Sequence, residues 1–236
     1  MLAAFRLAVE ETRRAAGVGT TMRIGCAPAL PVERLLEYVT ALRDREPDLS
    51  IQVSHLFTLE QLRRLQAGEL DLAIGFDSGD DPDLEKQPLF TGELLAAYVR
   101  RDHRLAEKRV LGPDNVREET LVTGPSWTNP TVYEQTLTRF GEAGYRFQTI
   151  VEAGGATWPD LLVAVASGHG VAFAPASLED HKTVVRLQLD PGLRMPEVVV
   201  AWRTDAPPGL KDFFETAREV AQTLWVSSGA GETQSG

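Results

Sequence analysis

The sequence predicts an α/β fold in which two lobes of similar construction follow one another along the chain. Residues 58–75 contain a helix, its stop signal and a buried strand within eighteen positions. Strands alternate with helices three times in the first hundred residues, and the alternation resumes after residue 120. Because alternating strands and helices are typical of parallel, doubly wound sheets, we expect such a sheet in each lobe.

The segment 58–75 is the most informative part of the first lobe. Thr58 and Gln61 have the spacing of a capping box, and leucines 59, 62 and 65 recur with helical spacing. Gly68 suits the left-handed conformation that ends a helix, and the apolar run 70–74 is typical of a covered parallel strand. Further strands are predicted at 22–26, 50–55 and 94–99, with an amphipathic helix that ends at Pro47.

The second lobe repeats the same signals. Asn129 before Pro130 predicts a helix start, and Thr157 with Asp160 forms a second capping box. After the stop at 168–170, a strand 197–203 and a closing helix 210–224 complete the chain, and the small polar residues 226–236 are expected to be disordered. The remaining predicted elements are strands at 120–123, 147–151 and 171–174, and a helix over 130–143.

Composition restricts the classes of function. The 236 residues carry a formal charge of −10 and the isoelectric point is about 5.0, so the mean field repels a phosphate backbone. A single cysteine, Cys26, excludes an internal disulfide and fits a reducing compartment. The sequence shows neither a secretory signal nor a run long enough to span a membrane, so we expect a cytoplasmic protein that does not contact membranes.

Four ordered markers resemble the effector-binding domain of LysR-type transcriptional regulators over roughly residues 20–225. These markers are Arg23-Ile-Gly25, Gly68-Glu-Leu-Asp-Leu-Ala-Ile74, His103-Arg-Leu-Ala106 and Val165-Ala-Ser-Gly-His-Gly-Val-Ala-Phe-Ala-Pro175. The resemblance implies two Rossmann-like lobes with a central cleft, similar to type II periplasmic binding proteins, and an effector bound between them. The family's N-terminal winged helix-turn-helix has no counterpart in this sequence, so operator DNA would be bound only through that missing domain.

The same resemblance implies a division of the chain. Residues 1–20 look like the end of a linker helix, residues 21–99 with 201–225 like the first lobe, and residues 100–200 like the second. A narrow apolar stripe in residues 1–16 fits a helix that packs against another chain. Family likeness also implies self-association as a dimer or tetramer.

Helix N-termini at the carboxyl ends of strands are where ligands gather in open α/β sheets. Matched to the family pattern, five residues fall on positions that often line the effector pocket, and Trp127 is added as a second aromatic wall. Ala29 departs from the hydroxyl residue that is frequent there, which puts a carboxylate-binding mode in doubt. The six predicted effector-binding residues are Ala29, Thr58, Trp127, Pro130, Val132 and Trp158.

Each of these residues also has a structural interpretation. Thr58 could act only as a helix cap, and Trp127 and Trp158 could be core residues. Cys26 invites a redox role, but a small buried hydrophobe is the alternative, since no second cysteine could resolve an oxidised sulfur. Of the four histidines only His55, close to Thr58, is a pocket candidate.

The predicted function is an effector-sensing domain that transmits ligand binding to attached DNA-binding domains. No nucleophile elbow, phosphate loop or acidic pair indicates catalysis, and no cofactor or metal ligand set is recognisable. The alternative is a free-standing solute-binding protein or small-acid enzyme with the same architecture.

Overall fold

The computed structural model describes residues 21–179, 181–205 and 211–232. The chain divides into two compact units: unit 1 comprises residues 1–91 and 197–236, and unit 2 comprises residues 92–196. Each unit is described by itself below. The linker helix predicted for residues 1–20 lies outside the described residues.

Unit 1 contains a five-stranded sheet with the strand order β2-β1-β3-β11-β4. The first three strands along the chain are parallel, whereas β11 runs antiparallel to both of its neighbours. The sheet is therefore mixed, and the strand β4 was not predicted. The strands are β1 (Thr21–Cys26), β2 (Ser50–His55), β3 (Leu72–Phe76), β4 (Leu84–Phe90) and β11 (Val198–Arg203).

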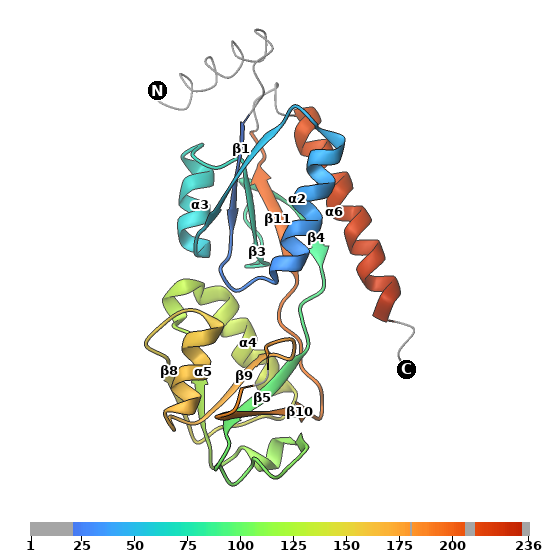
Figure 1. Cartoon of the computed structure of the whole chain (residues 1–236). Helices are drawn as coiled ribbons and strands as arrows, with labels where there is room; N and C mark the ends of the chain where they lie inside the picture. The colour runs from blue at the N-terminus through green and yellow to red at the C-terminus, as the bar shows by residue number, and fades with distance from the viewer. Residues whose placement is uncertain (1–20, 180, 206–210, 233–236) are drawn as a thin grey trace. The chain divides into compact units, whose positions relative to one another are not determined.

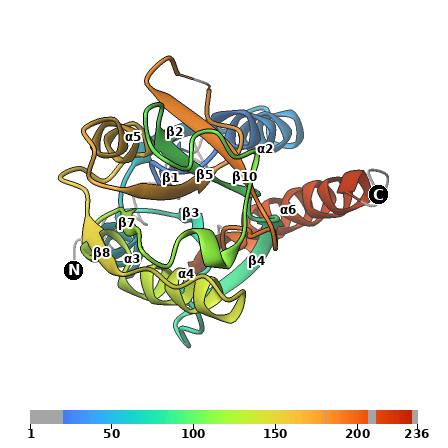
Figure 2. The same ribbon diagram turned by 90° about the horizontal axis from the view of Figure 1, so that it is seen from below.

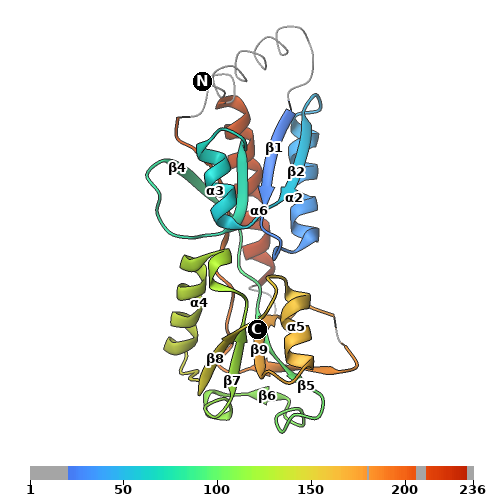
Figure 3. The ribbon, with the colours of Figure 1, turned by 90° about the vertical axis from the view of Figure 1, so that its left-hand side faces the viewer.

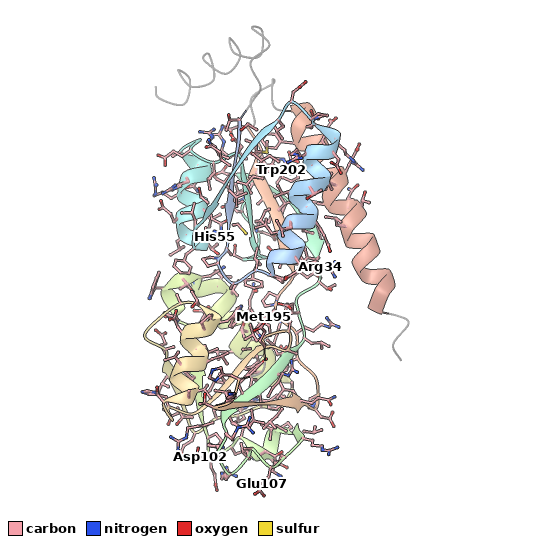
Figure 4. All side chains as sticks on the ribbon, in the orientation of Figure 1. Arg34, His55, Asp102, Glu107, Met195 and Trp202 are labelled. Atoms are coloured by element: carbon pink, nitrogen blue, oxygen red, sulfur yellow. The ribbon has the colours of Figure 1, made fainter. Side chains whose placement is uncertain are left out.

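Three helices cover the two faces of this sheet (Figure 1). α2 (Val32–Arg45) and α6 (Lys211–Glu232) share one face, where they enclose the main core, and α3 (Thr58–Gln66) covers the other face. The Tyr38 hydroxyl of α2 donates to the Ala217 carbonyl of α6 over 3.2 Å. Trp202, labelled in Figure 4, stacks on Phe214 with ring centroids 5.8 Å apart. The sheet of unit 1 is therefore covered by packed helices on both of its faces.

The last helix is longer than the sequence indicated. α6 continues to Glu232, past the helix end at residue 224 that the sequence predicted, and residues 233–236 lie outside the described part. Extending an existing helix adds one hydrogen bond per residue without a new nucleation cost, so even small polar residues can prolong it.

Unit 2 contains a six-stranded sheet with the order β6-β10-β5-β9-β7-β8. α4 (Pro130–Glu142) lies on one face and α5 (Trp158–Ala166) on the other, as Figures 2 and 3 show. Two 3-10 turns, Pro113–Asn115 and Ser126–Thr128, occur in the connections. The strands are β5 (Leu95–Arg100), β6 (Val110–Leu111), β7 (Thr120–Thr123), β8 (Thr149–Glu152), β9 (Val171–Pro175) and β10 (Val184–Leu189).

The residues of β9 alternate between the two faces of this sheet. Ala172 and Ala174 pack with Leu161 and Val165 of α5. Phe173 points to the opposite face, where its ring centroid lies 5.1 to 5.4 Å from those of three other aromatic residues. Edge-to-face contacts of this kind add to the apolar area that each ring buries. These three residues are Phe140, Tyr145 and Phe147.

The strand β5 was expected in the first lobe, but it pairs with β9 and β10 in the sheet of unit 2. The units therefore divide after Thr91 and after Pro196, whereas the sequence suggested divisions after residues 99 and 200. An apolar run such as Leu95–Val99 indicates a strand covered on both faces. It carries no information about which of two similar sheets the strand joins.

Candidate functional site

The carboxyl ends of the three parallel strands of unit 1 bring two predicted residues to one edge of the sheet. The Leu56 N–H donates to the Cys26 carbonyl over 2.9 Å, so the segment after β2 runs beside the end of β1. The Ala27 N–H donates to the Ile74 carbonyl of β3, also over 2.9 Å. Ala29 and Thr58 follow on these adjacent segments, and both are half-buried.

Two helices of unit 1 begin at this edge without a side-chain cap. The cap residues are Pro31 for α2 and Phe57 for α3, and the side chain of neither accepts a backbone N–H. Helix starts carry a partial positive charge and N–H groups that point along the axis. This edge of unit 1 is therefore suited to a polar or anionic group of a small molecule.

The capping box predicted for Thr58 and Gln61 is wrong. Phe57 has the extended conformation of a cap residue, with φ −69° and ψ 156°, so Thr58 is already the first residue of α3. A cap side chain must come from the residue before the helix. The Gln61 side chain instead donates from Nε2 to the Leu56 carbonyl over 2.7 Å.

Unit 2 has an equivalent edge, because β7 is parallel to both β8 and β9. Both helix starts at this edge have the caps that the sequence predicted. The Asn129 Oδ1 accepts the Val132 N–H over 3.2 Å, and the Thr157 N–H donates to Asp160 Oδ2 over 3.0 Å. Hydrogen bonds from Thr157 lower the pKa of Asp160, because they stabilise the carboxylate.

The four predicted effector-binding residues of unit 2 differ in how far their side chains are exposed to solvent. Trp127, in the turn before α4, is 58% exposed, and Pro130 is exposed at the helix start. Val132 is buried, and Trp158 is half-buried against the core beneath α5. Trp127 and Pro130 thus present apolar surface, whereas Val132 and Trp158 contribute chiefly to packing and offer a smaller accessible part.

One acidic residue at this edge was not predicted from the sequence. The Ser126 N–H, in the turn that carries Trp127, donates to Glu152 Oε1 at the end of β8 over 3.2 Å. The parallel pairing of β7 with β8 brings these distant positions together. A sequence pattern could have found Glu152 only through the rule that strand carboxyl ends share an edge.

The described residues include neither a reactive thiolate nor a group of side chains that could hold a metal ion. Cys26 is buried, and desolvation raises the pKa of its thiol to about 12, which removes the reactive thiolate at neutral pH. Among the described residues, no three His, Cys, Asp or Glu side chains are grouped so that they could hold a metal ion. His55, labelled in Figure 4, is exposed at the end of β2.

A family model described as the LysR substrate binding domain matches residues 15–222. The chain belongs to this family. The regulator CatR of Pseudomonas putida is 29% identical over 203 residues, which cover 84% of this chain and 68% of CatR. BenM of Acinetobacter baylyi is 26% identical over 218 residues, covering 90% and 70% of the two chains. The described helices of this LysR domain include none that is long and apolar enough to cross a membrane.

Solved structures of LysR effector-binding domains have the same fold. The BenM domain with its effector benzoate gives a TM-score of 0.69 at 22% identity and covers 89% of this chain and 93% of that one. The QuiR domain in complex with shikimate gives 0.73 at 17% identity and covers 88% and 99%. The predicted α/β class, similar to type II periplasmic binding proteins, is thus confirmed, and the chain is an effector-binding domain of the LysR type.

Proposed function

We propose that this LysR domain senses a small-molecule effector and passes the signal to attached DNA-binding domains. The main support is the pair of strand edges: each unit places helix starts and predicted contact residues at the carboxyl ends of its parallel strands. Ligands of open α/β sheets gather at such edges. Ligand binding can then shift the equilibrium between two conformations of the regulator.

The chemistry of the six proposed contact residues suggests the class of effector. Thr58 supplies a hydroxyl at the start of α3, Trp127 and Trp158 supply indole rings, and the other three are apolar. None of the six carries a charge. We therefore propose that the effector is a small ring compound that also carries a polar group. Benzoate and shikimate, which appear in the BenM and QuiR structures, are small ring compounds with a polar carboxylate group.

Further proposals follow from membership of a family of transcriptional regulators. We propose that the chain has no catalytic activity, acts in the cytoplasm and associates with itself as a dimer or tetramer. Contact with operator DNA would come from a separate DNA-binding domain, because the charge of −10 repels the phosphate backbone. Light scattering on the purified chain tests self-association, and a monomer at high concentration would contradict it.

The effector proposal is tested first by a thermal-shift screen with benzoate, shikimate, other aromatic acids and amino acids. A ligand that raises the melting temperature is then titrated by calorimetry against Thr58→Val and Trp158→Phe. In Thr58→Val, the loss of one hydrogen bond to the ligand should weaken affinity by about 1–3 kcal/mol, which is roughly fivefold to 150-fold.

Thr138→Val provides a matched control, because Thr138 is exposed in the interior of α4. This variant should bind as the unchanged chain does. Unchanged affinity in both Thr58→Val and Trp158→Phe would overturn the assignment of the site. The absence of any ligand among the ring compounds of the screen would overturn the proposed effector class.

A further inference from the structure

Gln61 is one of the few polar side chains buried in the described part of unit 1, with only 2% of its surface exposed. Its carboxamide lies within the first turn and a half of α3 and points back toward the residue before the cap. Nε2 donates to the Leu56 carbonyl over 2.7 Å, a short and well-formed hydrogen bond. A buried donor that lost this partner would remain unsatisfied, and the free-energy cost of that loss stabilises the present orientation of the side chain.

Packing fixes the stem of the same side chain. A Cβ placed on Gly25 of β1 would lie 3.1 Å from Gln61 Cγ and 2.6 Å from Leu70 Cδ1. A Cβ on Gly75 of β3 would lie 4.0 Å from Gln61 Nε2. The missing side chain at Gly25 thus creates the space for the Gln61 stem, whereas a Cβ on Gly75 would only reach ordinary van der Waals contact with the carboxamide. The carboxamide is held near the carboxyl ends of both strands.

Both backbone polar groups of Leu56 are therefore hydrogen-bonded. Its N–H donates to the Cys26 carbonyl over 2.9 Å, and its carbonyl accepts from Gln61 Nε2 over 2.7 Å. The Gln61 backbone N–H also donates to the Phe57 carbonyl over 3.0 Å. The Gln61 side chain therefore fixes the Leu56 carbonyl, next to the Phe57 carbonyl that the backbone N–H of the same residue holds.

We propose that Gln61 is a positioning residue that sets the backbone of Leu56 and Phe57 and thereby places Thr58 and the start of α3 for the effector. The role toward the effector rests on the proposed function, whereas the positioning of the backbone does not. The arrangement requires a donor of this length at position 61. Glutamate would present an acceptor to the Leu56 carbonyl, and methionine would fill the same space without donating.

The experiment measures amide hydrogen exchange by NMR on the whole chain without ligand. Gln61→Met is compared with Gln66→Met, because Gln66 is exposed at the end of the same helix. We expect exchange of the Leu56 and Gln61 amides to accelerate at least about tenfold in Gln61→Met, since local opening exposes them. The amides that join β1 and β3 should keep their rates, and Gln66→Met should change neither set.

Two outcomes would overturn the proposal. One is unchanged exchange at Leu56 and Gln61; the other is an equal acceleration throughout unit 1, which would indicate a general stability role. If Gln61→Met does not fold, the side-chain amide protons of Gln61 in the unchanged chain decide the question. These protons should exchange slowly compared with those of Gln66, and equal rates would contradict the hydrogen bond.

A third variant tests the packing part without removing the donor. Gly25→Ala should displace the stem of Gln61 and accelerate exchange at Leu56, because the added methyl meets Gln61 and Leu70. Unchanged exchange at Leu56 in this variant would show that the space beside Gly25 does not hold the Gln61 side chain in place. Failure of the proposed function has a different signature: local loosening in Gln61→Met together with unchanged ligand affinity in Thr58→Val.

Discussion

The ion pair between Arg23 and Asp71 should be a principal stabilising contact of unit 1. Asp71, whose side chain is 7% exposed, accepts the backbone N–H of Arg23 over 2.8 Å. It also accepts Nε over 3.0 Å and Nη2 over 2.7 Å from the same arginine. The Asp71 N–H donates in turn to the Arg23 carbonyl over 2.9 Å. The carboxylate therefore joins β1 to the residue that precedes β3.

The substitution Asp71→Asn removes the charge and places an NH₂ group among three donors. Removing one partner of a fully buried ion pair costs roughly 3–5 kcal/mol, because the other charge is left uncompensated. The Arg23 side chain is 23% exposed and can recover part of its hydration. We therefore expect a loss of about 2–3 kcal/mol in the free energy of unfolding. For a chain of this length the melting temperature should fall by roughly 5–10 °C.

Urea unfolding followed by circular dichroism measures this loss, with Glu37→Gln as the control. Glu37 accepts from Arg34 over 3.0 Å, but the two side chains are 49% and 45% exposed, so this pair should contribute less than about 0.5 kcal/mol. Arg23→Met completes a double-mutant cycle with Asp71→Asn and should give a coupling of about 1–2 kcal/mol. Similar losses in Asp71→Asn and Glu37→Gln would refute the reasoning.

Three further outcomes are expected. Cys26 should not react with a thiol reagent at pH 8 until urea unfolds the chain, because burial raises its pKa to about 12; rapid native reaction would contradict this. Gly170→Ala should lower the free energy of unfolding by at least about 2 kcal/mol, since φ is +147° and the added Cβ would lie 2.2 Å from the Thr120 carbonyl oxygen; a neutral effect in urea unfolding would refute the clash. The hydrogen bond from Arg63 lowers the pKa of Glu60 from 4.5 to about 2, so its contribution to stability is complete above about pH 4.5 and disappears as the pH falls toward 2. Glu60→Gln should reduce the pH dependence of the urea midpoint in this range, and an unchanged dependence would count against the pair.

Local signals in the sequence predicted the helices well, because helix starts and stops depend on neighbouring residues. Asn129 and Thr157 cap α4 and α5 as expected, and Gly68 ends the turn after α3 with φ +66°. The strand β4 was missed, since Pro88 interrupts its pattern and its partner β11 lies more than a hundred residues later. The sheet to which β5 belongs is likewise decided by distant pairing, which periodicity does not encode.

The segment at Thr58 and Gln61 shows where prediction from sequence reaches its physical limit. A spacing of three residues fits both a capping box and a side chain that reaches back to the preceding loop. The second arrangement prevails because Gly25 leaves room over β1 for the Gln61 stem, the carboxamide fits beside Gly75 of β3, and the Leu56 carbonyl offers an acceptor there. Both strands had to be paired before that space existed. A local motif can therefore specify the helix, whereas the role of Gln61 depends on a sheet assembled from distant parts of the chain.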